Sequence, residues 1–348
     1  MTADAIGGVW NYSVNLIRAL APYGVDVILA TMGRRPSADQ RRQVATISNL
    51  CLAESDFKLE WMDDPWTDIN RASDWLLQLE SKWKPAVIHL NGYSHSALPW
   101  HVPHLVVAHS CVLSWWAAVR RIALPNQWLT YAERVAEGLR TAELVIAPTA
   151  AMLAELRRIY QWDGRGVVIW NGLVPPAPDT SISKQEFLLT AGRLWDEAKN
   201  LPAVEAIAQK ISWPVYAAGE AEASAQGCSV RRLGYLSAPE MREWMARASI
   251  YVLPARYEPF GLSILEAALS QCALVIGDIP SLRELWEGAA WLVAPDDISE
   301  LRHALMTLIR QPALRGEFAV RARDRARRYE PERMAKQYLA VYHNLLEG

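Results

Sequence analysis

Short apolar segments with strand character alternate with amphipathic helical segments along nearly the whole chain. Strands that alternate with helices in this way form parallel sheets with helices on both faces. The pattern therefore predicts an α/β protein. The strands expected from it are 25–30, 58–61, 86–90, 105–108, 144–147, 167–169, 187–190, 215–218, 230–233, 250–253, 274–276 and 291–293.

The length of 348 residues predicts two domains, because it exceeds what one hydrophobic core usually supports. Residues 173–181 are rich in proline and lack periodicity, which favours a linker there. Residues 331–346 carry apolar side chains on one helical stripe. The expected division is a first domain at 1–172, a second at 173–330 and a terminal helix at 331–348. The other helices are expected at 9–20, 69–80, 131–139, 150–159, 202–210, 239–248, 261–270 and 299–309.

Composition narrows the class of protein. The net charge is −2 and the pI is near 6.4, which gives no support for a nucleic-acid binder. An apolar run of roughly 18 residues, the length that favours a membrane span, is missing from the sequence. The N-terminus has no signal-peptide pattern, and the cysteines Cys51, Cys111, Cys228 and Cys272 lie far apart. These features predict reduced thiols in a cytoplasmic protein with at most peripheral membrane contact.

One segment, Glu258-Pro-Phe-Gly-Leu-Ser-Ile-Leu-Glu266, joins a buried strand to a helix. A helix that begins near Gly261 presents free backbone N–H groups and a partial positive charge, which suit a phosphate. Gly261 also lets a ligand approach the backbone closely. Glu266, a little over one turn in, could accept hydrogen bonds from two ribose hydroxyls. A solvated helix face is the competing interpretation, because charged helix residues usually lie at the surface.

Other candidate positions also follow strands or begin helices. Arg193 and Lys199 come after the expected strand 187–190, where two cations suit a diphosphate, although a solvated loop has the same composition. Gly7-Gly8 precedes the helix 9–20 and could turn backbone amides toward an anion or form a plain turn. His109 ends an apolar strand at the edge where α/β sheets collect ligands, or is a satisfied loop histidine.

Metal-binding patterns are missing from the sequence. The histidines between His89 and His109 have irregular spacing, which argues against a metal site. The acidic residues Asp63 and Asp64 are consecutive, and so are Asp296 and Asp297. A pair of carboxylates that holds a metal ion and a diphosphate is instead separated in the sequence. We therefore expect chemistry without a metal and without a cofactor, in which cations and helix starts stabilise the leaving group.

Together these motifs resemble glycosyltransferase family 4 (group 1), whose members are retaining enzymes. Residues 258–266 are similar to the family's Glu-Pro-Phe-Gly-Leu-x-x-Leu-Glu string, and 191–200 are similar to its Gly-Arg-Leu…Lys-Asn motif. The resemblance implies the α/β fold named GT-B. In this fold two Rossmann-like domains face each other across a cleft, and the C-terminal helix crosses back to the first domain.

The resemblance also implies an activity and a set of roles. It implies transfer of a hexose from a nucleotide-diphosphate sugar, with a UDP-glucose-like donor, to a glycan, lipid-linked or small-molecule acceptor. Catalytic roles fall to His109 and Glu258 beside the sugar, and Glu266 would hold the ribose. Retention would follow front-face attack, with the leaving phosphate taking the acceptor proton. The expected donor-binding residues are Gly7, Gly8, Arg193, Lys199, Tyr235, Leu236, Glu258, Phe260, Gly261, Leu262, Ser263 and Glu266.

Two alternatives share this layout. A GT-B nucleotide-sugar 2-epimerase needs no acceptor and should carry more acid/base carboxylates. A non-catalytic nucleotide-sugar-binding protein is favoured only by the start of the chain, where a stub of strand precedes Gly7-Gly8. Loss of most of a central strand exposes its neighbours, so we expect a less stable first domain unless residues upstream complete it.

Overall fold

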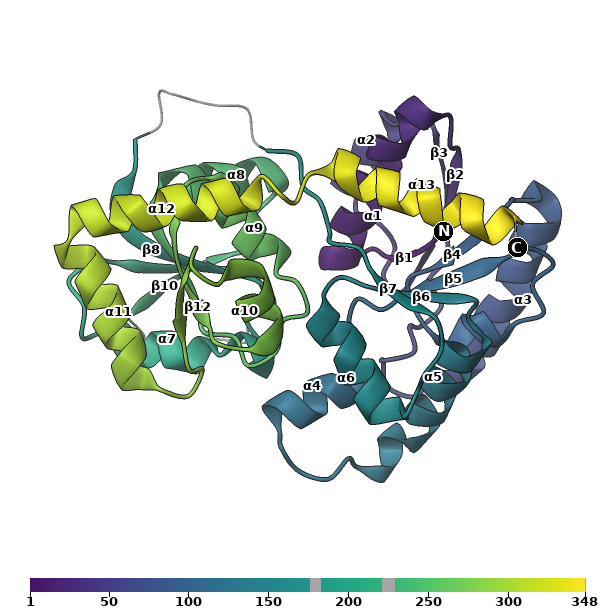
Figure 1. Cartoon of the computed structure of the whole chain (residues 1–348), viewed down its shortest axis with the longest axis horizontal. Helices are drawn as coiled ribbons and strands as arrows, with labels where there is room; N and C mark the ends of the chain where they lie inside the picture. The colour runs from purple at the N-terminus through teal and green to yellow at the C-terminus, as the bar shows by residue number, and fades with distance from the viewer. Residues whose placement is uncertain (176–182, 221–228, 348) are drawn as a thin grey trace. The chain divides into compact units, whose positions relative to one another are not determined.

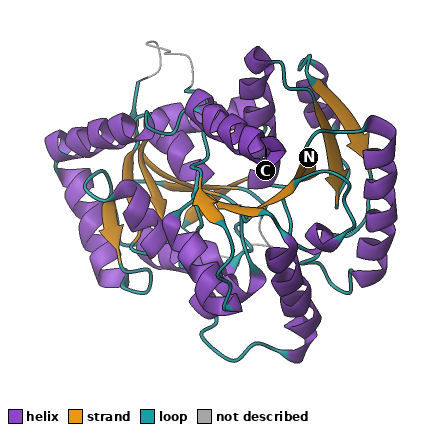
Figure 2. Ribbon diagram, turned by 45° about the vertical axis from the view of Figure 1, so that its right-hand side comes forward, coloured by secondary structure: helices purple, strands orange, loops and turns teal. Residues whose placement is uncertain are grey.

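A computed structural model describes residues 1–175, 183–220 and 229–347, and the chain divides into two compact units. Unit 1 comprises Met1–Gly172 together with Pro331–Gly348, and unit 2 comprises Leu173–Glu330. Each unit has parallel strands with helices packed around them, which confirms the predicted α/β class (Figures 1 and 2). Most of the proline-rich stretch 173–181, and Cys228, lie outside the described residues.

Unit 2 contains a six-stranded parallel sheet in the order β10-β9-β8-β11-β12-β13. This is the 3-2-1-4-5-6 order of a Rossmann fold, and it reverses between β8 and β11. Of its central strands, β11 and β12 are buried along their whole length and β8 is buried from Phe187 onward, as a sheet covered on both faces requires. The strands are β8 (Gln185–Ala191), β9 (Val215–Ala218), β10 (Val230–Gly234), β11 (Ala248–Leu253), β12 (Ala273–Gly277) and β13 (Trp291–Val293).

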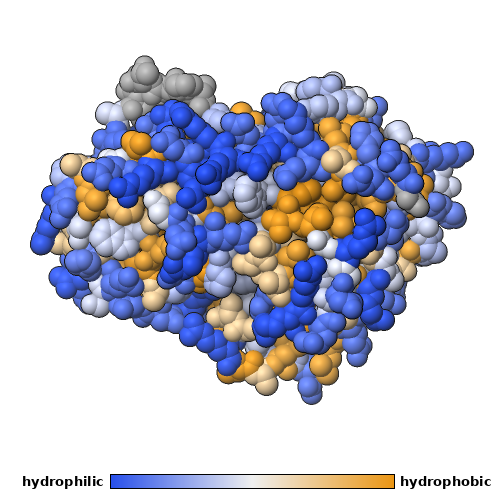
Figure 3. All heavy atoms as spheres, viewed as in Figure 1, coloured by the Kyte–Doolittle hydropathy of each residue, from blue (hydrophilic) through white to orange (hydrophobic). Residues whose placement is uncertain are grey.

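The helices of unit 2 bury one face against this sheet and expose the other. Helix α12 contacts β12 and α9, and its outer surface is strongly hydrophilic (Figure 3). The elements are η4 (Glu197–Lys199), α7 (Leu201–Ala208), α8 (Ala238–Arg247), α9 (Leu262–Leu269), α10 (Pro280–Trp286), α11 (Ile298–Arg310) and α12 (Pro312–Ala326).

Unit 1 contains two parallel ladders, β1-β2-β3 and β4-β5-β6-β7. Strand β1 is short, and side-chain hydrogen bonds join it to β4. The Asn91 backbone N–H donates to Thr2 Oγ1 at 2.8 Å, and Asn91 Nδ2 donates to the Thr2 carbonyl at 2.6 Å. The strands are β1 (Thr2–Asp4), β2 (Val27–Met32), β3 (Leu50–Glu54), β4 (Ile88–Leu90), β5 (His104–Val107), β6 (Leu144–Ala147) and β7 (Gly166–Val168).

The C-terminal helix α13 (Pro331–Glu347) packs on α1 (Gly8–Leu20) within unit 1, as predicted. The Tyr12 hydroxyl donates to the Tyr338 hydroxyl at 2.6 Å, and it also lies 3.2 Å from His89 Nε2. Burial of this network makes the helix an integral part of the core. The remaining elements are η1 (Ala21–Tyr23), α2 (Ala38–Ala45), α3 (Trp66–Trp83), η2 (Ser94–Ala97), α4 (Val112–Val119), η3 (Asn126–Trp128), α5 (Leu129–Thr141) and α6 (Ala150–Tyr160).

One predicted strand is wrong. Residues 58–61 lie in the loop after β3, and the strand is Leu50–Glu54, which pairs with β2 along its whole length. The Lys58 backbone N–H donates to Asp68, and its Nζ donates to the carbonyls of Asp63 and Asp64, so this segment closes a loop instead of joining the ladder. The other predicted strands and helices overlap observed elements.

Candidate functional site

The sequence-predicted pair Lys199 and Glu258 meets at the strand-order reversal of unit 2. Lys199 ends η4, which follows β8, and Glu258 lies in the loop after β11. Lys199 Nζ lies 2.5 Å from Glu258 Oε2, and the two side chains are only 14% and 13% exposed. Ligands of open α/β sheets bind at the carboxyl ends of strands where the order reverses. The pair therefore lies where this fold class presents a ligand site.

Tyr251 lies close to both glutamates of the 258–266 segment. Its hydroxyl donates to the Ala191 carbonyl at 3.0 Å and lies 2.9 Å from Ser263 Oγ. It thereby joins the ends of β8 and β11 to the first turn of α9. Burial, with the negative charges of Glu258 and Glu266, raises the pKa of Tyr251. Burial also raises the pKa of Glu266, to about 7.

Gly261 is the N-cap of α9, which begins at Leu262, so the helix starts where it was predicted to start; the φ of Gly261 is 85°. A Cβ there would lie 2.8 Å from the Ile264 side chain and 3.3 Å from that of Glu258, so the position favours glycine. Leu262 and Ser263 form the first turn. Phe260 is buried and packs edge-on against Tyr329 at 5.6 Å between ring centroids, so its side chain belongs to the core of unit 2.

Arg193 lies in the same turn as Lys199 but is more exposed. Its guanidinium is 3.3 Å from Asp196 Oδ2, and its side chain is 45% exposed. It also stacks over the Trp195 ring at 5.6 Å. The turn thus contains two cations: Lys199, whose side chain is largely buried, and Arg193, whose side chain is partly exposed to solvent.

A glycine turn that the sequence reasoning missed adjoins this loop. Gly219 follows β9, and its N–H donates to the Gly234 carbonyl at 2.8 Å. Gly234 leads into Tyr235, whose side chain is 75% exposed, and Leu236, which is half-buried. The carboxyl ends of β8, β9 and β10 therefore meet at Gly192, Gly219 and Gly234. The position of Gly219 directly after a strand could have identified it.

In unit 1, His109 and the Gly7-Gly8 turn lie at the carboxyl ends of β5 and β1. His109 Nε2 is 2.8 Å from Asn91 Oδ1, and its ring contacts Tyr12 edge-on at 4.4 Å between centroids. Burial lowers the pKa of His109 to about 3. Gly7, with a φ of 81°, is the N-cap of α1, and both glycines are exposed. Asn91, which sequence reasoning also missed, follows β4 at the same edge.

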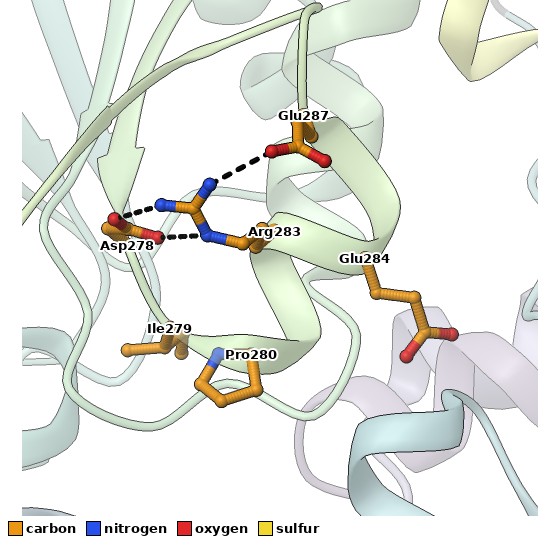
Figure 4. A pocket seen from close by; sticks show the side chains of 6 residues that line it. All are labelled: Asp278, Ile279, Pro280, Arg283, Glu284 and Glu287. Atoms are coloured by element: carbon orange, nitrogen blue, oxygen red, sulfur yellow. Dashed lines mark hydrogen bonds and ion pairs between the residues drawn. The ribbon is translucent and has the colours of Figure 1, made fainter.

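A surface hollow of about 580 Å³ lies beside α10 and does not include the predicted donor-binding residues (Figure 4). Arg283 crosses it, bonded to Asp278 and to Glu287. Helix α10 also contacts the loop after β11, because the Ser281 hydroxyl donates to the Glu258 carbonyl at 2.6 Å. Ser281 thereby holds the backbone of Glu258.

The described residues lack both a clustered metal site and a membrane-spanning helix. Within 1–175, 183–220 and 229–347, His, Cys, Asp and Glu side chains do not gather in groups of three that could hold a metal ion. In the same part of the chain, helices lack the combination of length and apolar character needed to cross a bilayer.

Family models match both units of the chain. Residues 6–175 match the model described as Glycosyltransferase Family 4, and residues 185–311 match that described as Glycosyl transferases group 1. The lipopolysaccharide core biosynthesis mannosyltransferase LpcC of Rhizobium leguminosarum bv. viciae is 37% identical over 132 residues, 36% of this chain and 37% of that protein. Glycogen synthase of Mycobacterium tuberculosis is 26% identical over 372 residues, 92% of this chain and 86% of that protein.

Solved structures of the same fold cover nearly the whole chain. Sucrose-phosphate synthase of Thermosynechococcus elongatus is 19% identical with a TM-score of 0.81, covering 98% of this chain and 94% of that one. HepE of Anabaena, solved in complex with UDP-glucose, is 17% identical with a TM-score of 0.75, covering 99% and 98%. At these identities the likeness establishes the fold, the two-domain GT-B architecture.

Proposed function

Because the chain belongs to the family 4, group 1 glycosyltransferases, we propose that it moves a hexose from a nucleotide-diphosphate sugar to an acceptor hydroxyl. The proposed reaction retains the anomeric configuration and uses no metal. The acceptor class stays open between a glycan, a lipid-linked sugar and a small molecule. HepE of Anabaena has been solved in complex with UDP and in complex with UDP-glucose, which supports a nucleotide-sugar donor of this kind.

The observation that carries the proposal is the largely buried ion pair between Lys199 and Glu258, which lies where the strand order reverses between β8 and β11. An ammonium group has three N–H donors, so a Lys199 that gives one to Glu258 keeps two for phosphate oxygens. Arg193 in the same turn supplies a second cation, and the start of α9 at Gly261 supplies free backbone N–H groups. These groups would stabilise the charge that develops on the leaving diphosphate.

In the proposed mechanism the acceptor oxygen attacks the anomeric carbon from the face that the diphosphate leaves. The bond from that carbon to the diphosphate oxygen breaks as the new glycosidic bond forms, and the leaving phosphate takes the acceptor proton. Glu258 accepts hydrogen bonds from the sugar hydroxyls and Glu266 from the ribose. His109 of unit 1 contacts the transferred sugar during the reaction.

The test is a panel of UDP-, GDP- and ADP-sugars, followed by thermal shift and by analysis of products. A transferase should release free nucleoside diphosphate slowly by hydrolysis when no acceptor is present. An altered sugar on an intact diphosphate would instead identify a 2-epimerase. Binding of the panel without either product would identify a non-catalytic nucleotide-sugar-binding protein.

Replacement of Glu266 by alanine should weaken nucleoside-diphosphate binding by about 1–3 kcal/mol, the cost of leaving polar partners unpaired. Calorimetry with UDP, or with the base that the panel selects, measures the effect. Glu284→Ala is a matched control, because Glu284 lines the hollow beside α10 instead of the predicted donor site. Unchanged affinity in Glu266→Ala would remove Glu266 from the ribose role.

The raised pKa of Glu266, about 7, predicts pH-dependent binding. The neutral carboxyl, favoured below that pH, accepts hydroxyl hydrogen bonds less well than the carboxylate. Affinity should therefore fall by about tenfold as the pH goes from one unit above the pKa to one unit below it. Glu266→Gln cannot ionise, so it should lose this dependence while keeping whatever dependence the phosphates of the ligand produce.

A further inference from the structure

The amide of Asn91 has one orientation that its surroundings allow. Its Nδ2 lies 2.6 Å from the carbonyl oxygen of Thr2 and 3.4 Å from Ser13 Oγ. A backbone carbonyl only accepts hydrogen bonds, so the atom facing it must be the NH₂ group. The opposite orientation would bring two acceptor oxygens together. The Asn91 carbonyl oxygen therefore faces His109.

This orientation decides which nitrogen of His109 carries the proton. Asn91 Oδ1 is an acceptor and lies 2.8 Å from His109 Nε2, so Nε2 must donate. Burial lowers the pKa of the ring to about 3, so at neutral pH it is uncharged and has a single N–H. The lone pair then lies on Nδ1, for which no hydrogen-bond partner is present among the described residues.

A second contact holds the ring in place. The Tyr12 ring packs edge-on against His109, with 66° between the ring planes. Tyr12 is itself held by its hydroxyl, which donates to Tyr338 and lies within hydrogen-bond distance of His89. The imidazole is therefore constrained at one nitrogen by Asn91 and on its side by Tyr12.

We propose that Asn91 is a positioning residue that locks His109 in the Nε2–H tautomer and so presents Nδ1 as a hydrogen-bond acceptor. Resting on the proposed function, the inference adds that Nδ1 accepts from a hydroxyl of the transferred sugar. His109 then contributes a neutral acceptor at the reacting face. A donor sugar lacking that one hydroxyl would lose the contact, which makes the position a determinant of donor specificity.

The tautomer can be measured directly in the full-length protein labelled with ¹⁵N-histidine. Long-range ¹H–¹⁵N correlation spectra distinguish a protonated ring nitrogen from an unprotonated one, and His109→Gln identifies the His109 signals by their loss. We expect a protonated Nε2 and an unprotonated Nδ1 in the unmodified protein. A protonated Nδ1 at neutral pH would overturn the proposal without any reference to activity.

Two variants test the part played by Asn91. Asn91→Leu removes the acceptor, so the Nδ1–H tautomer should appear and turnover should fall by about ten- to a hundredfold, as when an orienting partner of a functional histidine is lost. Asn91→Asp keeps an acceptor oxygen and should keep Nε2 protonated, but it places a second oxygen against the Thr2 carbonyl, so it should also lower stability toward urea. Asn15→Leu, a matched change on α1 where Asn15 bonds only to the Asn11 carbonyl, should alter neither readout.

The remaining outcomes separate this inference from the proposed function. An unchanged His109 spectrum in folded Asn91→Leu would show that Asn91 does not set the tautomer. Turnover of a panel of deoxy-sugar donors should fall at one hydroxyl position, and that loss should vanish in His109→Gln. If no donor is turned over by the unmodified protein, the proposed function fails, while the spectra still decide the tautomer.

Discussion

Lys199→Met is expected to lower the rate of nucleoside-diphosphate release by about 10²–10³-fold, the loss typical of removing one group that stabilises developing charge. Methionine keeps most of the length of the side chain and deletes the ammonium group. The effect should appear mainly in kcat, because the interaction strengthens as the diphosphate leaves. Steady-state kinetics with the donor selected by the panel measures it.

The same substitution also leaves the largely buried Glu258 carboxylate without its cation. The loss of this ion pair should lower the free energy of unfolding as well as the rate. The double variant Lys199→Met/Glu258→Gln removes the stranded charge. We expect it to regain stability toward urea but not turnover. Recovery of kcat in the double variant would show that Lys199 serves only to neutralise Glu258 and would also remove the Glu258 carboxylate from its proposed role at the sugar.

Two further variants complete this comparison. Arg232→Met breaks a partly exposed ion pair with Glu205 in the same unit, 2.9 Å long, and should cost stability without a change in kcat. Arg193→Ala removes the more exposed cation of the turn and should lower kcat by less than Lys199→Met. Equal losses of stability and turnover in Lys199→Met and Arg232→Met would instead identify structural charges.

Gly219→Ala is expected to have the largest effect on nucleotide binding among changes that add a single methyl group. A Cβ at this position would lie 1.8 Å from the Gly192 carbonyl oxygen, a separation that requires the backbone to move. The φ of Gly219, 137°, is also one that alanine rarely adopts. The backbone conformation alone costs about 1–3 kcal/mol, and relief of the clash displaces the turn that contains Arg193 and Lys199.

Urea denaturation and calorimetry with the nucleoside diphosphate together measure this prediction. Gly316→Ala is the matched control, because Gly316 lies within α12 and a Cβ there meets no atom within 4 Å. That change should raise the free energy of unfolding by about 0.5–1 kcal/mol. Full nucleotide affinity in Gly219→Ala would show that the Gly192–Gly219 contact does not shape the donor site.

Local patterns were sufficient to predict the α/β class and most of the elements. The apolar runs at β6, β9 and β13 have the predicted limits, because buried parallel strands consist of continuous hydrophobic residues. Hydrophobic periodicity failed to predict β3. This strand lies at the edge of its sheet and is partly exposed, so apolar and polar residues alternate only weakly along it. Helix α2 was missed although Ser37 and Gln40 form a capping box, a pattern that could have revealed it.

The sequence predicted those residues of the candidate site that directly follow a strand or begin a helix. The strand-end rule identified Arg193, Lys199 and His109, and the helix start identified Gly261. Gly219 and Asn91 also follow strands, so the same rule could have predicted them. Phe260 was expected to bind the donor because it belongs to the 258–266 motif. Its side chain packs into the core against Tyr329.

The sequence alone determined which residues occupy strand ends and helix starts, because hydrophobic periodicity and glycine placement are properties of neighbouring positions. Only the tertiary structure decided which of these ends meet. Lys199 and Glu258 are 59 positions apart, and they form an ion pair because β8 and β11 are adjacent where the strand order reverses. Likewise Thr2, Asn91 and His109 form one hydrogen-bonded chain, because the start of β1 lies beside the end of β4, and β4 pairs with β5.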